Sequence, residues 1–182
     1  PGALWKLDQI DANRVVEHPD LARVVVGADP TASSTGDEAG IITAGIAGDD
    51  YYTLDDDSRQ GTPQEWASAA VAAYHRHKAD CIVAEKNNGG EMVEAVIKQV
   101  DPKVNVKLVW ASRGKATRAE PIAAIAEQGR DHHVGYFPQL EDELCMWLPG
   151  ESSPNRLDAK VWAITELSNG GVTVVKNPFY EY

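Results

Sequence analysis

The sequence of 182 residues lacks any apolar run close to the ~20 residues that a membrane-crossing helix needs, which excludes such a helix. It also opens without the basic and then apolar segments of a secretory signal. Its two cysteines, Cys81 and Cys145, fit no zinc-binding spacing, so we expect buried, reduced thiols in a cytosolic protein. The first residue is proline and not methionine, which suggests a fragment of a longer chain.

Positive charge is scarce as well, because 17 lysines and arginines face 28 aspartates and glutamates, for a net charge of −11. This balance argues against a free-standing nucleic-acid-binding protein, which is usually basic. The charge is unevenly spread, however. Residues 103–118 hold five basic residues and no acidic one, whereas residues 49–57 hold five aspartates and no base. The basic run can therefore bind phosphate locally, and we interpret the acidic run as solvated surface.

The remaining composition, 43% hydrophobic and 25% charged, is typical of a globular protein. At this length we expect one folded domain with a substantial core. Residues 1–20 are rich in charge, and we interpret them as an irregular linker or lead-in from a preceding domain. The folded domain is then expected over residues 21–182.

Hydrophobic periodicity and turn residues predict the order β-β-β-α-β-α-β, followed by further helices. The expected strands cover residues 22–28, 39–47, 51–54, 80–85 and 104–110, and the expected helices begin near residues 63, 92, 115, 140 and 155. Short connections favour an antiparallel meander for the first three strands. This order is that of the ribonuclease H-like fold, an α/β fold in which helices flank a mixed five-stranded sheet.

Three acidic residues fall where such a sheet gathers polar groups. Asp29 ends the first strand after three consecutive valines, Glu85 ends the fourth strand, and Asp158 lies in the first turns of the last helix. Carboxylates are preferred ligands of Mg²⁺ and Mn²⁺. Two such ions, roughly 3.5–4 Å apart, can support hydrolysis of a phosphodiester. We therefore expect these three residues to be catalytic and to bind metal, with a turn-capping Asp29 as the alternative.

Longer motifs carry a more specific resemblance. They are Gly27-Ala28-Asp29-Pro30, Ala84-Glu85-Lys86-Asn87-Asn88-Gly89-Gly90, Ser112-Arg113-Gly114-Lys115-Ala116-Thr117-Arg118-Ala119-Glu120-Pro121, Leu140-Glu141-Asp142-Glu143-Leu144-Cys145 and Ser153-Pro154-Asn155-Arg156-Leu157-Asp158-Ala159. Taken in order over residues 22–168, they resemble the nuclease domain of the large terminase subunit of tailed bacteriophages. In this resemblance Asp29, Glu85 and Asp158 match the three metal-binding acids of the family.

The resemblance implies an activity and its partners. The activity is metal-dependent endonucleolytic cutting of double-stranded viral DNA during genome packaging, with two Mg²⁺ or Mn²⁺ ions. The implied partners are double-stranded DNA, the terminase ATPase domain of the full chain, the small terminase subunit and the portal, with no membrane. The implied location is the host cell cytoplasm. No Gly-x-x-x-x-Gly-Lys-Ser/Thr loop occurs, so residues 1–20 would be the trailing end of the linker from that ATPase domain.

Other residues have expected supporting roles. Asn155 precedes Asp158 by three residues and so shares its side of the helix. There it would contact a metal-binding residue without touching the metal, contact the site through a water molecule, or only cap the helix. Arg113, Lys115 and Arg118 are expected to contact DNA phosphates, with an ordinary solvated loop as the alternative.

Four residues have no expected part in the chemistry. His132 and His133 resemble a family feature, and we interpret both as structural. Asp131 and Lys160 occupy positions where apolar residues are expected, so the packing around them is in question, more than the site itself.

Three other functions share parts of this pattern. A non-catalytic DNA-gripping or assembly module would use the same fold, although three acids at one edge count against a bare DNA surface. Another ribonuclease H-like nuclease, of the resolvase or integrase type, fits the acids alone. Half of an actin-like ATPase shares the strand order but would need a second half.

Overall fold

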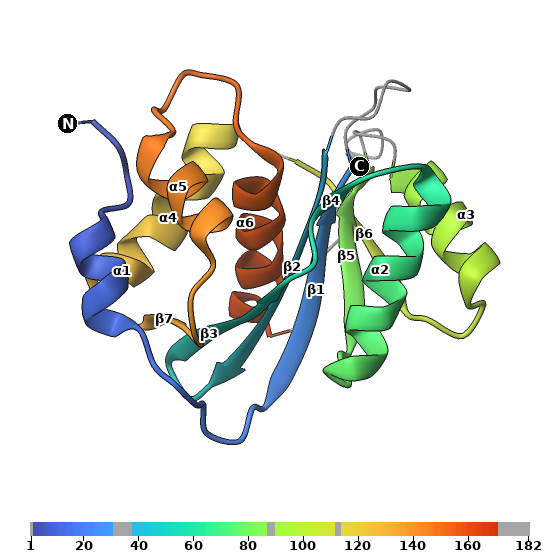
Figure 1. Cartoon of the computed structure of the whole chain (residues 1–182), viewed down its shortest axis with the longest axis horizontal. Helices are drawn as coiled ribbons and strands as arrows, with labels where there is room; N and C mark the ends of the chain where they lie inside the picture. Colours follow the sequence, from blue (N-terminus) through green and yellow to red (C-terminus); the bar gives the residue numbers. More distant parts are fainter. Residues whose placement is uncertain (1, 31–37, 87–89, 112–113, 171–182) are drawn as a thin grey trace, which may run out of the picture.

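The computed structural model describes residues 2–30, 38–86, 90–111 and 114–170, and within them a mixed sheet lies between two layers of helices (Figure 1). The strands are β1 (Arg23–Asp29), β2 (Glu38–Ala47), β3 (Asp50–Asp56), β4 (Arg59–Gln60), β5 (Cys81–Glu85), β6 (Val106–Val109) and β7 (Asp131–His133). Their order across the sheet is β6-β5-β1-β2-β3-β7, with β4 beside β2. The β1–β2 and β2–β3 pairs are antiparallel, and the β1–β5, β5–β6 and β3–β7 pairs are parallel.

The predicted antiparallel meander and flanking helices are confirmed, but the predicted number of five strands is wrong, because the described part of the chain contains seven. The two unpredicted strands, β4 and β7, are only two and three residues long. Both consist of polar residues, so neither shows the apolar alternation on which strand prediction depends.

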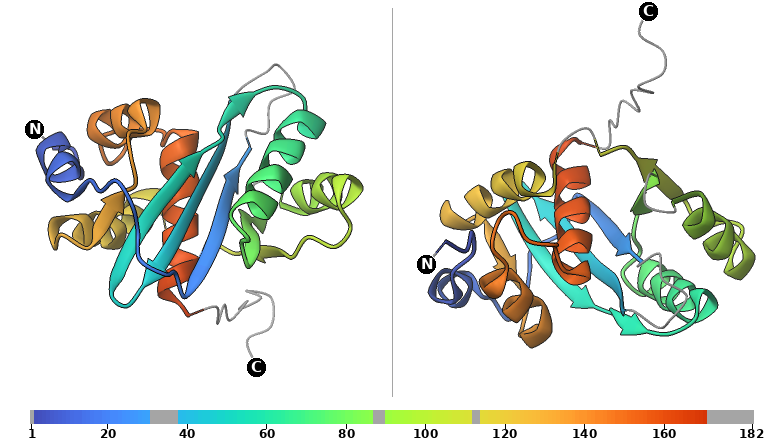
Figure 2. Two further views of the ribbon diagram at one scale, coloured as in Figure 1. Left: turned by 60° about the horizontal axis from the view of Figure 1, so that its bottom comes forward. Right: turned by 90° about the horizontal axis from the view of Figure 1, so that it is seen from above.

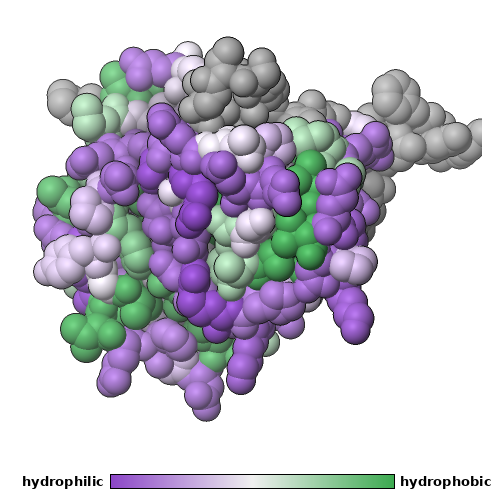
Figure 3. Space-filling view, turned by 45° about the vertical axis from the view of Figure 1, so that its right-hand side comes forward, coloured by the Kyte–Doolittle hydropathy of each residue, from purple (hydrophilic) through white to green (hydrophobic). Residues whose placement is uncertain are grey.

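Alternating side chains of β1 build a separate core on each face of the sheet. Val25 packs with the helices of one layer, whereas Val24 and Val26 pack with those of the other. The first layer contains α1 (Leu7–Asn13), α4 (Lys115–Glu127), α5 (Pro138–Met146) and α6 (Asn155–Ser168), and the second contains α2 (Pro63–Arg76) and α3 (Gly90–Val100) (Figure 2). The side that carries α2 and α3 is largely hydrophilic, with hydrophobic residues in small separate areas (Figure 3).

The irregular lead-in predicted over residues 1–20 is wrong in part, because α1 lies within it. Trp5 and Ile10 are buried in the core, and Val15 forms a bridge to Val134 beside β7. The apolar residues of this segment are few, but these three are placed against elements distant in sequence. Charge content alone is therefore a misleading guide to the segment.

Two other observations bear on the sequence predictions. Both cysteines are free thiols, but only Cys81 is buried, and burial raises its pKa to about 11, whereas Cys145 is half-buried. Among the described residues, no helix combines the length and apolar composition that crossing a bilayer requires.

Helix α6 lies directly on the sheet because glycines of β1 and β2 allow its backbone to approach. A Cβ atom on Gly27 would overlap the carbonyl oxygen of Ala159, and one on Gly40 would overlap that of Asn155. Both contacts are with main-chain atoms of the helix. The sheet residues at these two positions therefore have to be glycine for the helix to lie at this depth.

A network of buried polar side chains connects the middle of α6 to the sheet. The Lys160 side chain is fully buried, and its Nζ lies 2.9 Å from Asp131 Oδ2, 2.8 Å from Thr53 Oγ1 and 3.1 Å from His133 Nε2. The two residues that the sequence analysis questioned, Asp131 and Lys160, are thus ion-pair partners. Because lysine only donates, His133 Nε2 accepts, and its Nδ1 donates to Glu141 Oε2 over 2.8 Å. Arg14 completes the network with two 2.7 Å hydrogen bonds to the Glu141 carboxylate.

His133 should make the domain sensitive to mild acid. Burial, and then the nearby charge of Lys160, lower the pKa of His133 from its ordinary value of 6.5. The folded state therefore binds this proton less well than the unfolded chain, so its stability is complete above pH 6.5 and falls as the pH drops below that value. Between pH 7.5 and 5.5, we expect this residue to lower the unfolding free energy by no more than about 1.4 kcal/mol, the limit for one proton bound by the unfolded chain over one pH unit.

Denaturant unfolding at the two pH values tests this expectation. His133→Gln should lose less stability on acidification than the wild type. His18→Gln is the matched control, because His18 is exposed and forms no ion pair within the described residues, and it should follow the wild type. Equal acid sensitivity of His133→Gln and the wild type would show that His133 does not titrate as expected.

Candidate active site

Asp29 and Glu85 end neighbouring parallel strands, and both lie at one edge of the sheet. The register places Gly27 of β1 opposite Val83 of β5, so two residues later Asp29 comes opposite Glu85. Side chains two residues apart share a face, and Gly27 and Val83 both face α6. The two carboxylates therefore point to the α6 side of the sheet. Asp29 is 5% exposed, and the Glu85 side chain is 14% exposed.

Asp158 reaches the same edge from the first turn of α6. Asp29 pairs with Gly40 across β1 and β2, and Gly40 lies beneath Asn155, at the start of that helix. A helix N-terminus favours a nearby negative charge. Asp158 is buried, and Ser153 Oγ donates a 2.7 Å hydrogen bond to its Oδ2. The structure thus brings the three predicted acids from β1, β5 and α6 to one edge of the sheet.

The three acids do not form a closed ligand set. Within residues 2–30, 38–86, 90–111 and 114–170, no three histidine, cysteine, aspartate or glutamate side chains converge closely enough to hold a metal ion. Two of the carboxylates instead contact basic side chains. Lys115 Nζ lies 3.2 Å from Asp158 Oδ2, and Arg118 Nη1 lies 3.7 Å from Glu85 Oε2.

Two of the three predicted DNA-contacting residues lie on the first turn of α4, and the third, Arg113, is outside the described residues. The Lys115 side chain is 47% exposed, whereas that of Arg118 is 15% exposed. The guanidinium carbon of Arg118 lies over the Trp162 ring of α6, 4.6 Å from its centroid. Both residues therefore point toward Asp29, Glu85 and Asp158, which we call the acidic edge of the sheet. Neither is part of an ordinary solvated loop.

Asn155 has a different contact from the predicted ones. Its Nδ2 donates to the carbonyl oxygen of Glu38, so it ties the start of α6 to β2. The N-cap position is Pro154, which has no side chain able to cap the helix, and the carboxylate of Glu143 on α5 instead accepts a 3.0 Å hydrogen bond from the backbone N–H of Arg156. Asn155 thus stabilises the position of Asp158 through the backbone of β2.

Arg156 is a site-forming residue that the sequence analysis missed. It is 5% exposed, and it pairs with Asp56 of β3 at 2.9 Å, Glu143 of α5 at 3.1 Å and Glu38 of β2. Burial raises the pKa of Glu143, although hydrogen bonds from Arg156 oppose this shift. The acidic run that we interpreted as solvated surface therefore supplies a partner to a buried arginine, Asp56. The available signal was an arginine on a largely apolar helix, with an acidic motif earlier in the sequence.

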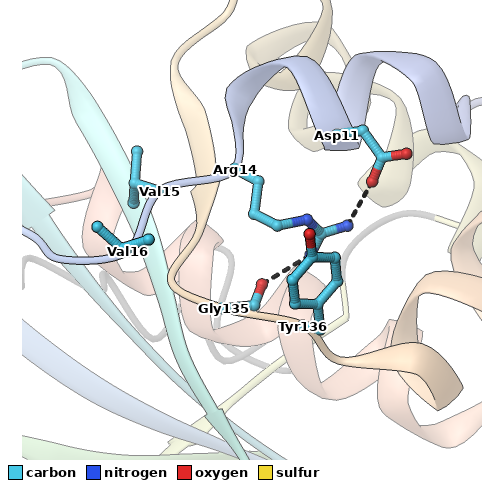
Figure 4. Close-up of a pocket in the computed structure, with 6 residues that line it drawn as sticks. All are labelled: Asp11, Arg14, Val15, Val16, Gly135 and Tyr136. Carbon is cyan, nitrogen blue, oxygen red and sulfur yellow. Dashed lines mark hydrogen bonds and ion pairs between the residues drawn. The ribbon is translucent and has the colours of Figure 1, made fainter.

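A pocket at the β7 edge is separate from these residues (Figure 4). It is lined by Asp11, Arg14, Val15, Val16, Gly135 and Tyr136. The guanidinium of Arg14 lies over the Tyr136 ring, 4.0 Å from its centroid, and donates to the Gly135 carbonyl and Asp11. None of the predicted site residues lines this pocket.

Comparison with known proteins agrees with the geometry. A family model described as the terminase RNaseH-like domain matches residues 26–167. The sequence has no significant match among curated proteins.

Several solved structures share the fold. The large terminase nuclease from thermophilic phage G20c has a TM-score of 0.66 at 12% identity, covering 91% of this chain and 99% of that one. The human cytomegalovirus terminase nuclease domain has a TM-score of 0.67 at 12% identity, covering 90% and 95%. The large terminase from a second thermophilic bacteriophage has a TM-score of 0.66 at 13% identity over 91% of this chain, which covers only 44% of the length of that protein.

At such identities these structures support the fold, which is ribonuclease H-like as predicted. The family model is more specific, since it matches most of the chain and includes Asp29, Glu85 and Asp158. The chain therefore belongs to the terminase RNaseH-like domain family.

Proposed function

We propose that this domain is a divalent-metal-dependent endonuclease that cuts double-stranded phage DNA during genome packaging, by two-metal hydrolysis of the phosphodiester bond. The observation that carries the proposal is the position of Asp29, Glu85 and Asp158 at one edge of the sheet. Family membership supports a nuclease role. Related nucleases were solved with manganese, cobalt or zinc, which supports a divalent metal.

The donor set fits oxygen-preferring cations, because it consists of three carboxylates, and we propose Mg²⁺ or Mn²⁺ held by Asp29, Glu85 and Asp158. When bound, such a pair of ions supplies an activated water and stabilises the leaving oxygen. The protein contributes orientation: the hydrogen bond from Ser153 fixes the Asp158 carboxylate. Lys115 and Arg118, together with Arg113, would supply positive charge for the DNA backbone.

Other parts of the proposal concern the larger assembly. The chain spans 44% of the large terminase from the second thermophilic phage, and that protein was also solved with ATP-gamma-S. We therefore propose an ATPase domain in the full chain, joined through residues 1–20, and the small terminase subunit and portal as partners in the host cytoplasm. Because the domain is acidic overall, it should bind DNA weakly by itself.

A plasmid-cleavage assay tests the activity. The purified domain should cut supercoiled plasmid with Mn²⁺ or Mg²⁺ and should stop when a chelator is added. Asp29→Asn preserves the shape of the side chain but removes its charge, so we expect cleavage to fall at least about 100-fold. Asp142→Asn is the matched control, because Asp142 is exposed on α5, and it should cut normally.

Two results would count against the proposal. Cleavage that persists in chelator, or in Asp29→Asn, would contradict a metal mechanism at this edge of the sheet. DNA binding without cleavage under any ion would instead favour a non-catalytic DNA-gripping module.

A further inference from the structure

The first turn of α4 presents two cations to the acidic edge. Lys115 and Arg118 are three residues apart on this helix and so lie on the same side of it. One contacts Asp158 of α6 and the other contacts Glu85 of β5. A single helical turn therefore neutralises two of the three carboxylates that the proposed function assigns to metal binding.

The Arg118–Glu85 pair is longer than the buried ion pairs of the domain, and the Lys115–Asp158 pair is close in length to Arg156–Glu143, at 3.1 Å. The N–O distances of the two pairs at the acidic edge are 3.7 and 3.2 Å, whereas Arg14–Glu141 and Lys107–Glu166 are both 2.7 Å. A charge-assisted hydrogen bond is usually about 2.7–2.9 Å long. The Arg118–Glu85 contact is therefore too long for a charge-assisted hydrogen bond, and Lys115–Asp158 involves a lysine side chain that is 47% exposed, which makes both pairs weak enough for a competing cation to replace.

Arg118 also has a hydrogen-bond donor that is not satisfied in its present position. Within the described residues its buried Nε has no hydrogen-bond partner, and the guanidinium is held mainly by the Trp162 ring and the distant Glu85 carboxylate. A buried donor without a partner carries a desolvation cost. Movement of Arg118 toward a phosphate would relieve that cost.

We propose that Lys115 and Arg118 are exchangeable counter-cations of the acidic edge. They neutralise Asp158 and Glu85 until divalent cations bind, and metal binding releases both side chains to pair with DNA phosphates. The inference rests on the proposed function, because it requires the carboxylates to bind divalent ions. It adds that the same two residues oppose metal binding and favour DNA binding, so that metal and DNA bind cooperatively.

The first test measures Mn²⁺ affinity by titration calorimetry on the whole 182-residue chain without DNA. Lys115→Met and Arg118→Met remove a competitor for the carboxylates, so each should bind Mn²⁺ roughly fivefold more tightly than the wild type. Lys86→Met is the matched control, because it removes one positive charge next to Glu85 in the sequence, but Lys86 pairs with Glu91 and lies over Trp110. The control should stay within about twofold of the wild type.

The second test uses the wild-type chain and detects the release itself. Lysines are acetylated with a low dose of reagent, with and without saturating Mg²⁺, and the rate at each lysine is measured by mass spectrometry. Lys115 should react roughly threefold faster with Mg²⁺, because its amine no longer contacts Asp158, while Lys86 serves as the internal control with an unchanged rate.

The outcomes separate this inference from the proposed function. If the wild type binds neither Mn²⁺ nor Mg²⁺, the proposed metal site itself is wrong. If it binds both, but the Mn²⁺ affinity of the variants and the Mg²⁺ dependence of Lys115 acetylation are unchanged, only the counter-cation role is overturned.

Discussion

Gly27→Ala is expected to lower the free energy of unfolding by about 3 kcal/mol or more, at the upper end of overpacking effects. The added methyl group would overlap the carbonyl oxygen of Ala159 and approach the Ala163 side chain to 3.2 Å. A side chain can change rotamer to make room, but a helix carbonyl cannot. Helix α6 would have to move away from β1, and Asp158 would move with it. Any folded protein that remains should therefore also lose cleavage activity.

Denaturant unfolding measures the stability, and plasmid cleavage at matched folded concentration measures the activity. Gly114→Ala is the control: a Cβ there meets nothing within 4 Å, and its φ of −61° suits any residue. We expect a loss below about 1 kcal/mol, from the poorer N-cap of α4 alone. A Gly27→Ala protein as stable as Gly114→Ala would show that α6 does not lie this close to the sheet.

The sequence predicted the parts of the fold that depend on local pattern. The valine run before Asp29 and the turn residues after it indicate a buried strand and its end, and the next two strands follow at hairpin spacing. β4 and β7 escaped prediction, because their pairing is imposed by neighbouring strands and not by apolar residues of their own. The buried Trp5 of the N-terminal segment likewise owes its place to tertiary packing.

For the candidate site too, the sequence predicted one part and missed another. The strand ends and the helix start locate the three acids, because topology alone brings those ends together. The partners of the acids depend on side-chain geometry between distant elements. The sequence marks Lys115 and Arg118 as basic, but only the fold shows that both face carboxylates.

Polar residues on α6 show most clearly what cannot be predicted from the sequence alone. Arg156 and Lys160 look out of place on a buried helix, and the sequence offers no way to identify their partners. In the fold each is matched by acids from other elements, Arg156 by Asp56 and Glu143, and Lys160 by Asp131. Ion pairs to β2, β3 and β7 therefore add to the apolar packing of α6 against the sheet, and each can be lost through a single substitution.

Lys160→Met should accordingly cost about 3–5 kcal/mol of unfolding free energy, because it leaves a buried charge without its counterion. The side chain of Asp131 is 4% exposed, and Lys160 is its ion-pair partner. Thr53 and His133 lose a hydrogen-bond donor as well. Denaturant unfolding measures the effect, and Lys103→Met is the control, because Lys103 is exposed and its loss should change stability by less than about 0.5 kcal/mol.

A second substitution distinguishes the loss of the Lys160–Asp131 attraction from the cost of leaving the Asp131 carboxylate buried and unpaired. Adding Asp131→Leu to Lys160→Met removes the unpaired carboxylate and fills its place with apolar atoms, which in buried ion pairs is often neutral or stabilising. We therefore expect the double variant to recover more than half of the stability that Lys160→Met loses. If it stays as unstable as the single variant, the loss comes from Thr53, His133 or packing around α6 and not from the Asp131 charge. A Lys160→Met protein within about 1 kcal/mol of the wild type would mean that this ion pair contributes little to holding α6 on the sheet.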